Sequence, residues 1–142
     1  MTQTVLVTGA AAGLGNVIAT SLLKQGYQVV LTDVDATRAR EAAARLDDGQ
    51  DRVLALGLDI CQPQDFADAL DATITRFGSL DVLVNNAALT LATPVMEIAV
   101  EEFDRVIATN LRGTFVGCQT MGRYFATRGY GRIINLASLA GQ

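Results

Sequence analysis

The sequence Thr8-Gly9-Ala10-Ala11-Ala12-Gly13-Leu14-Gly15 decides the fold, because it joins the first apolar run of the chain to a segment with helical spacing. Gly9 permits a tight turn, Gly13 lets the backbone approach a ligand closely, and Gly15 leaves room for the helix to pack on the strand. The open amides where this helix starts, at Leu14 and around it, favour the charge of a pyrophosphate. Three glycines alone are equally compatible with an ordinary strand-to-helix turn, so the rest of the chain has to decide.

Five apolar runs rich in Val, Ile and Leu are continuous rather than alternating, which is typical of strands buried on both faces of a parallel sheet. They are Thr4–Val7, Gln28–Leu31, Val53–Leu58, Leu80–Val84 and Ile133–Ala137. Segments with helical spacing separate them. This alternation predicts an α/β fold with a doubly wound parallel sheet, Rossmann-like, with right-handed crossovers. In such folds ligands bind beyond the carboxyl ends of the strands.

Four helices are expected between the strands. The first has an apolar stripe and a glycine stop, the second is rich in Ala and Arg, the third ends at a glycine, and the fourth is long and interrupted or strained near two glycines. In the same order, they are marked by Leu14, Val17, Ile18, Ser21, Leu22 and Gly26; by Ala36–Leu46; by Phe66, Leu70, Ile74, Phe77 and Gly78; and by Val100 to about Thr127 with Gly113 and Gly117.

Composition excludes several classes of function. The chain has 142 residues, enough for one domain, with no histidine and a net charge of −4. Without histidine, Ser-His and Cys-His nucleophiles are absent and a metal site is not expected. The acidic balance argues against nucleic acid or an anionic membrane as a partner. Cys61 and Cys118 lie far apart, and no membrane span or signal peptide is visible, so we expect reduced thiols and a cytoplasmic protein.

A carboxylate stands where the second apolar run ends. Asp33 lies eighteen positions past Gly15, close to the offset of about 20 residues at which an acidic side chain binds the ribose hydroxyls of a dinucleotide. A carboxylate there repels a 2′-phosphate, and no basic residue replaces Ala12 or Val34, so we predict NAD rather than NADP. Asp35 could share this role, and a solvated turn residue is the alternative for Asp33. A P-loop is excluded because no Gly-Lys pair exists.

Further motifs follow the remaining strands. They are Leu83–Ala88 after the fourth run, Asp59-Ile60 after the third, Asn110–Phe115 in the long helix, and Gly131–Ser138 in the last run. In order and spacing they resemble the short-chain dehydrogenase/reductase family over the whole chain. The spacing of the three glycines is similar to the ordinary subclass of that family rather than to the extended, epimerase-like one. The final alanine of the Leu83–Ala88 motif stands where the family usually has glycine, which affects only the local backbone.

The resemblance implies cofactor contacts for several residues. Asp59 would accept a hydrogen bond from the adenine amino group, with Ile60 packed nearby. Asn86 and Ala87 would line the ribose and nicotinamide side of the cofactor, while Asn85 would brace the sheet. Without the resemblance, the two asparagines could be turn formers and the isoleucine a core residue.

The resemblance also implies a catalytic tetrad, Asn-Ser-Tyr-Lys. Asn110 would hold a water in a proton relay and Ser138 would hydrogen-bond the substrate oxygen; a helix kink and a loop residue are the alternatives. The family's Tyr-x-x-x-Lys should follow the serine by about a dozen residues, but the sequence given ends at Gln142. Tyr124 and Arg128 have the spacing but precede the serine, so we expect surface or interface residues there.

Residues 1–142 are therefore expected to form one NAD-binding domain of the Rossmann type, incomplete at its carboxyl end. The implied activity is an NAD(H)-dependent oxidoreductase that interconverts a secondary alcohol and a ketone by hydride transfer. The alternative is a non-catalytic NAD-binding module.

Self-association is the last expectation. The final strand would be an open sheet edge, and the long helix presents an apolar face too broad for one contact with the sheet. That face comprises Leu111, Phe115, Cys118, Met121 and Phe125. With the resemblance, this predicts a homo-oligomer, a tetramer, for the complete protein.

Overall fold

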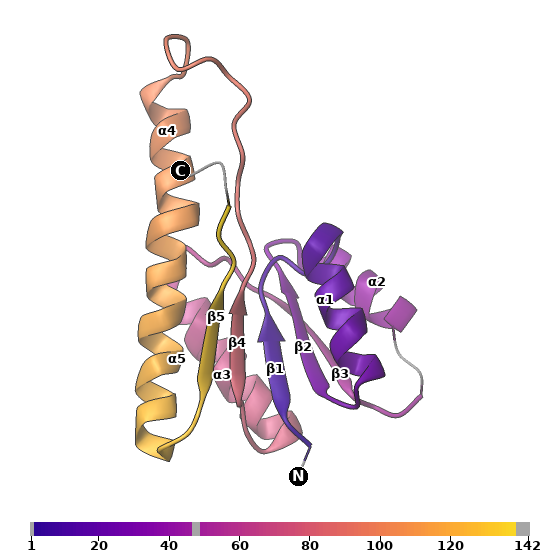
Figure 1. Cartoon of the computed structure of the whole chain (residues 1–142). Helices are drawn as coiled ribbons and strands as arrows, with labels where there is room; N and C mark the ends of the chain where they lie inside the picture. The colour runs from indigo at the N-terminus through magenta and orange to yellow at the C-terminus, as the bar shows by residue number, and fades with distance from the viewer. Residues whose placement is uncertain (1, 47–48, 139–142) are drawn as a thin grey trace.

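A computed structural model of the chain describes residues 2–46 and 49–138. Within them, all strands are parallel and form one sheet in the order β3-β2-β1-β4-β5 (Figure 1). The strands are β1 (Thr4–Val7), β2 (Gln28–Asp33), β3 (Val53–Gly57), β4 (Val82–Asn85) and β5 (Arg132–Asn135). The order reverses at β1, so the predicted doubly wound, Rossmann-like sheet is confirmed. The predicted strands are all present, and their ends differ by one or two residues.

Helices cover both faces of this sheet. Those of the described residues are α1 (Gly13–Lys24), α2 (Ala36–Leu46), α3 (Pro63–Phe77), α4 (Val100–Ile107), the π-helix η1 (Ala108–Gly113) and α5 (Thr114–Arg128). Helices α1 and α2 pack on one face, and α3 and α5 on the other (Figure 1). In the described part of the chain, no helix has both the length and the apolar character needed to cross a membrane.

The two faces are separate hydrophobic cores. In β1, Val5 and Val7 belong to the core under α1 and α2, whereas Leu6 belongs to the core under α3 and α5. Alternate side chains of a strand point to opposite faces, so both sets must be apolar in a sheet covered on both sides. This is why the strands appear in the sequence as continuous apolar runs.

The buried face of α1 differs from the predicted stripe. Leu14 and Val17 are exposed, while Gly15, Ala19 and Leu23 are buried. Gly15 determines this orientation, since a Cβ there would lie 2.5 Å from both the Asn86 Nδ2 and the Gly9 carbonyl oxygen. The helix therefore turns Gly15 and Ala19 toward the sheet. The predicted stripe is confirmed for Ile18 and Leu22, which pack against the core, and was wrong for Leu14 and Val17.

The long helix is a continuous rod of α4, η1 and α5 that extends past the carboxyl ends of the strands (Figure 1). The predicted irregularity near Gly113 is confirmed, because η1 ends there. The predicted irregularity at Gly117 was wrong, since that residue lies inside regular α5. A Cβ on Gly117 would lie 2.8 Å from both the Asn85 Oδ1 and the Phe66 Cζ, so this glycine serves close packing.

The predicted single apolar face of the rod is divided between the core and the solvent. Met121 and Phe125 are buried on the sheet, whereas Leu111 and Phe115 are 66% and 59% exposed. Met121 lies six positions after Phe115, and six positions correspond to about 600° of helical rotation at 3.6 residues per turn. Because 600° is about 120° short of two full turns, the two side chains point about 120° apart. The prediction that these residues are too many for one contact with the sheet is confirmed, but they do not form a single face, because their side chains lie on different sides of the helix.

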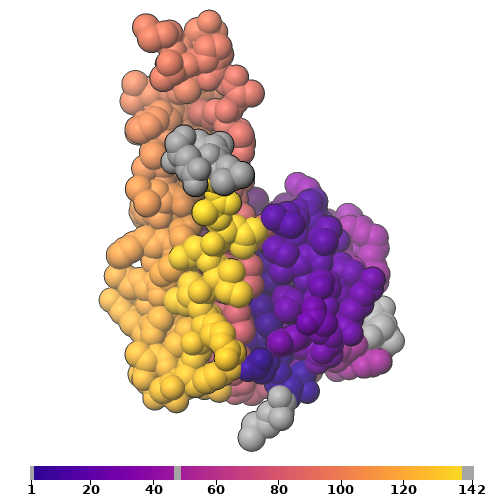
Figure 2. All heavy atoms as spheres, viewed as in Figure 1, coloured from indigo at the N-terminus to yellow at the C-terminus, as the bar shows by residue number. Residues whose placement is uncertain are grey.

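Strand β5 is the edge of the sheet within the described residues, as predicted. Its Ile134 is 50% exposed. Figure 2 shows β5 (yellow) uncovered at the surface, between α5 (orange) and α1 (indigo). The face of β5 on the α1 side is thus open.

A polar cluster joins the strands to α5 at the amino ends of the strands. The buried Asp81 accepts a hydrogen bond from the Thr4 amide at 2.9 Å and pairs with Arg128 at 3.1 Å. The Tyr124 hydroxyl accepts from the Leu80 amide at 3.4 Å, and the Arg128 guanidinium lies over the Tyr124 ring. Tyr124 and Arg128, which the sequence placed at the surface or an interface, therefore hold α5 to the sheet.

Asp81→Ala should lower the free energy of unfolding by about 2–4 kcal/mol, because it leaves the buried Thr4 amide without its side-chain acceptor and removes the ion pair of Arg128, whose guanidinium keeps the Leu80 carbonyl. Arg128→Ala should cost about 1–2 kcal/mol, less because that side chain is partly exposed. Urea denaturation of the purified chain measures both. Arg123→Ala, on an exposed turn of the same helix, is the control and should stay within about 0.5 kcal/mol; an equal loss there would contradict the role of the cluster.

Candidate functional site

A cleft of about 590 Å³ lies where β1, β2, β3 and β4 end, and the amino-terminal part of the rod forms one wall of it. Its lining includes residues after each of these strands. They are Gly9, Asp33, Val34, Arg38, Leu58, Asp59, Ile60, Cys61, Asn86, Ala87, Ala88, Leu89, Arg105 and Thr109. This is the position at which doubly wound sheets bind ligands, beside the point where the strand order reverses.

The three glycines of the first loop have different surroundings. Gly9 has φ +62°, and a Cβ there would lie 2.8 Å from the Ala87 Cα. Gly15, as described above, is packed as tightly. Gly13 has φ +57° with open space where a Cβ would stand. Ala12, which precedes α1, makes no side-chain cap hydrogen bond. The first turn of α1, with Leu14, thus keeps backbone donors that no capping side chain occupies, beside an open space.

Thr8 joins the glycine loop to the loop after β4, a role that was not predicted from the sequence. Its hydroxyl oxygen accepts hydrogen bonds from the Asn86 amide at 3.0 Å and the Ala87 amide at 3.1 Å. In return, the Asn86 Nδ2 donates to the carbonyls of Thr8 at 2.9 Å and Gly9 at 3.1 Å. The backbone amide and the side-chain Nδ2 of Asn86 therefore both hold the loop after β4 to the glycine loop. A threonine between a strand and a glycine loop was the available signal.

Asp33 is held at the cleft by backbone amides. Its Oδ2 accepts from the Ala11 amide at 3.3 Å and its Oδ1 from the Asp35 amide at 3.2 Å. The carboxylate thereby joins the glycine loop to the end of β2 and keeps lone pairs for a ligand, because a carboxylate can accept about four hydrogen bonds. Asp35 acts differently, since its Oδ1 accepts from the Thr37 and Arg38 amides, at 2.9 and 3.1 Å, and so caps α2.

The β3–α3 loop carries Asp59, Ile60 and Cys61. The Asp59 Oδ1 accepts from the Cys61 amide at 2.9 Å, and the Asp65 Oδ2 holds the Asp59 amide at 2.9 Å. Ile60 is buried, and a Cβ on Gly113 would lie 2.8 Å from its Cδ1. This loop therefore packs directly against η1.

Cys61 extends the same contact. Burial raises the pKa of its thiol above the ordinary value, so the thiol is protonated at neutral pH. It donates to the Ala108 carbonyl at 3.4 Å, at the start of η1. Both cysteines of the chain are free thiols.

The Asn85 Nδ2 donates a hydrogen bond to the Asn135 Oδ1 at 2.8 Å, which confirms that Asn85 braces the sheet.

Asn110 lies inside η1, and its side-chain amide pairs with the backbone of Leu89. Its Oδ1 accepts from the Leu89 amide and its Nδ2 donates to the Leu89 carbonyl, each at 2.8 Å. The Thr114 hydroxyl donates to the Asn110 carbonyl at 2.8 Å. A π-helical segment inside a helix is often found at a functional site, because it re-aims backbone groups. Ser138 follows β5 by three residues, beyond the same carboxyl edge of the sheet, and is exposed.

Comparison with known proteins identifies the family. The chain matches the family described as short chain dehydrogenase over residues 3–142. It is 35% identical over 135 residues to D-threitol dehydrogenase of Mycolicibacterium smegmatis, which covers 95% of this chain and 52% of that protein. It is 38% identical over 144 residues to 2-(R)-hydroxypropyl-CoM dehydrogenase of Xanthobacter autotrophicus, which covers 99% of this chain and 58% of that protein.

Two solved structures have the same fold. A short chain dehydrogenase from Bacillus anthracis superimposes with a TM-score of 0.92 at 30% identity, over 96% of this chain and 57% of that one. The 3-ketoacyl-(acyl-carrier-protein) reductase of Brucella melitensis, solved in complex with NADH, gives 0.86 at 31% identity over the same shares. The chain belongs to the short-chain dehydrogenase family, a family of oxidoreductases, and it spans about half the length of the curated relatives it matches.

Thr8→Val should lower the free energy of unfolding by about 2–4 kcal/mol, because it leaves the Asn86 and Ala87 amides without their acceptor. Thermal denaturation measures the effect. Thr20→Val is the matched control, since the Thr20 hydroxyl only donates to a carbonyl of its own helix; we expect a change of about 0.5 kcal/mol there. Equal stability of the two variants would show that the two loops do not depend on Thr8.

Proposed function

We propose that this protein is an NAD(H)-dependent oxidoreductase that interconverts a secondary alcohol and a ketone by hydride transfer. The observation that carries the proposal is the Asp33 carboxylate, which two backbone amides hold at the cleft beside an open glycine loop. The family and the NADH in the Brucella melitensis reductase support the choice of cofactor class.

The residues of the cleft fit the successive parts of one adenine dinucleotide. The amides at Gly13 and Leu14 would hold the pyrophosphate, and Asp33 would accept from the ribose hydroxyls. Asp59 and Ile60 would hold the adenine, with Asn86 and Ala87 near the second ribose. These residues line the cleft or stand at its glycine loop.

The bound nicotinamide supplies a hydride acceptor or donor. Asn110 and Ser138 are the residues we propose for the reacting end, the first holding a water and the second the substrate oxygen. The proposal for Asn110 is supported by its double pairing with Leu89, which fixes η1 against the loop after β4. The four residues that follow Ser138 in the sequence given include neither tyrosine nor lysine.

The second candidate is a non-catalytic NAD-binding module. The two candidates differ in turnover: a module would bind NADH but oxidise no secondary alcohol, because it would lack a proton-relaying tyrosine and lysine. We expect the 142-residue chain alone to be inactive. The length of the gene's reading frame separates the candidates directly. A reducing cytoplasm is the location we propose, supported by the two free thiols.

NADH should bind more tightly than NADPH, because the Asp33 carboxylate repels a 2′-phosphate at the ribose. Titration of the cofactor's fluorescence with the purified chain measures both affinities. The double change Asp33→Ala with Val34→Arg should narrow or reverse the preference by removing the repulsion and adding a cation. Tighter binding of NADPH to the unaltered chain would overturn the role of Asp33, and failure of both dinucleotides to bind would overturn the proposed function.

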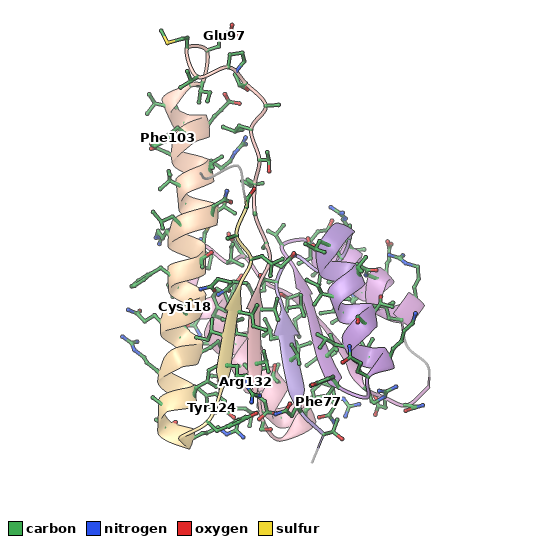
Figure 3. All side chains as sticks on the ribbon, viewed as in Figure 1. Phe77, Glu97, Phe103, Cys118, Tyr124 and Arg132 are labelled. Atoms are coloured by element: carbon green, nitrogen blue, oxygen red, sulfur yellow. The ribbon has the colours of Figure 1, made fainter. Side chains whose placement is uncertain are left out.

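We also propose a homo-oligomer, a tetramer in the complete protein. An exposed apolar stripe runs along the rod at spacings of three and four residues, and each side chain in it is between 39% and 68% exposed. It consists of Val100, Phe103, Ile107, Leu111 and Phe115. Phe103 lies on the part of the rod beyond the sheet (Figure 3). A contiguous apolar surface of this kind is typical of a subunit interface.

Light scattering should therefore find more than one chain per particle. Replacing Phe103 and Phe115 together by glutamate should shift the protein toward the monomer, because two charges would be buried at the interface. Val17→Glu, at an exposed apolar residue of α1, is the control and should leave the particle mass unchanged. A stable monomer of the unaltered chain at high concentration would contradict the proposed assembly.

A further inference from the structure

The cleft contains a cation that the sequence pattern did not associate with it. Arg38, in the first turn of α2, lines the cleft together with Asp33 and Val34. The sequence lacks a basic residue in the glycine loop or directly after β2, the two places where a phosphate-binding site was expected to need one. The turn between β2 and α2 is short, so a basic residue of the helix, Arg38, lines the cleft beside the end of β2 instead.

The guanidinium of Arg38 is available for a ligand. Its backbone amide is occupied by the Asp35 Oδ1 at 3.1 Å. Its side chain is exposed and forms no ion pair with any residue in the ranges that the structure describes. Asp33 therefore does not neutralise it, although the two groups line one cleft; the Asp33 oxygens are instead held by the Ala11 and Asp35 amides.

We propose that Arg38 is a latent anchor for a phosphate on the adenosine ribose, and that the Asp33 carboxylate alone prevents its use. This inference rests on the proposed function, since it concerns the ribose that Asp33 is proposed to bind. A 2′-phosphate would replace the hydroxyl nearest to Asp33 and would extend past Val34, where the exposed guanidinium can pair with it through two N–H groups.

Other positive groups near the cleft are less well placed to bind that phosphate. The amino terminus of α2 is already capped by Asp35, so its amides are not free for an anion. Arg105 lines the same cleft from α4, on the side of Leu89 and Thr109. Arg40 donates to the Thr37 hydroxyl at 3.1 Å and does not line the cleft. Both arginines are therefore matched controls that remove one charge each.

The test uses ADP-ribose and 2′-phospho-ADP-ribose, which carry the adenosine end without a nicotinamide, so binding is measured independently of activity. Calorimetric titration compares the unaltered chain, Asp33→Asn, and Asp33→Asn combined with Arg38→Gln, Arg40→Gln or Arg105→Gln. Asp33→Asn should raise affinity for the 2′-phosphate ligand by about tenfold or more, since it removes a like charge. Arg38→Gln should abolish most of that gain, and the two control changes should preserve it within about twofold.

The possible failures are distinct. A gain in Asp33→Asn that survives Arg38→Gln overturns the proposal for Arg38 and leaves the proposed function intact, and so does no gain at all while ADP-ribose binds the unaltered chain. Failure of the unaltered chain to bind ADP-ribose overturns both. Should Asp33→Asn not fold, as judged by its melting temperature, Asp33→Ser with and without Arg38→Gln gives the same decision. Arg38→Gln should then weaken binding of the 2′-phosphate ligand several-fold while binding of ADP-ribose is unaffected, and equal effects on the two ligands would overturn the proposal.

Discussion

The hydroxyl of Thr8 holds together the two loops on which the cleft depends. Thr8 directly follows β1, and its hydroxyl oxygen accepts hydrogen bonds from the backbone amides of Asn86 and Ala87. The Asn86 side chain donates two hydrogen bonds to carbonyls of the glycine loop. Because β1 and β4 are adjacent at the point where the strand order reverses, this contact joins the two loops on either side of the reversal. Gly15 can then pack on Asn86, and the position of α1 follows from it.

The cleft is organised by backbone amides and carboxylates more than by opposite charges. Asp33, Asp35 and Asp59 each accept hydrogen bonds from backbone amides of nearby turns, so an acidic chain can present a site for a phosphate-bearing ligand. The two arginines that line the cleft, Arg38 and Arg105, are exposed. Asp33 has both roles, because it anchors the glycine loop and is also the residue on which we propose that the ligand preference depends.

The adenosine end and the reacting end of the proposed site share one structural element. Ile60 packs on Gly113, Cys61 donates to Ala108, and Asn110 pairs with Leu89, so both ends contact the six residues of η1. These contacts with η1 come from two loops, the β3–α3 loop and the loop after β4. We infer that a substitution in the β3–α3 loop would shift the position of Asn110.

The sequence by itself determined the sheet, the positions of its strands, the glycine loop and the acidic residue at the end of β2, because apolar runs, glycines and strand-end carboxylates act through local geometry and burial. Only the tertiary structure decided which face of α1 is buried, how the apolar residues of the rod divide between core and surface, and that Arg38 and Thr8 belong to the cleft. Each of these depends on how far a helix rotates when it packs, or on which side chain reaches across from another element. Neither is encoded in local spacing, because both result from contacts between residues far apart in the chain.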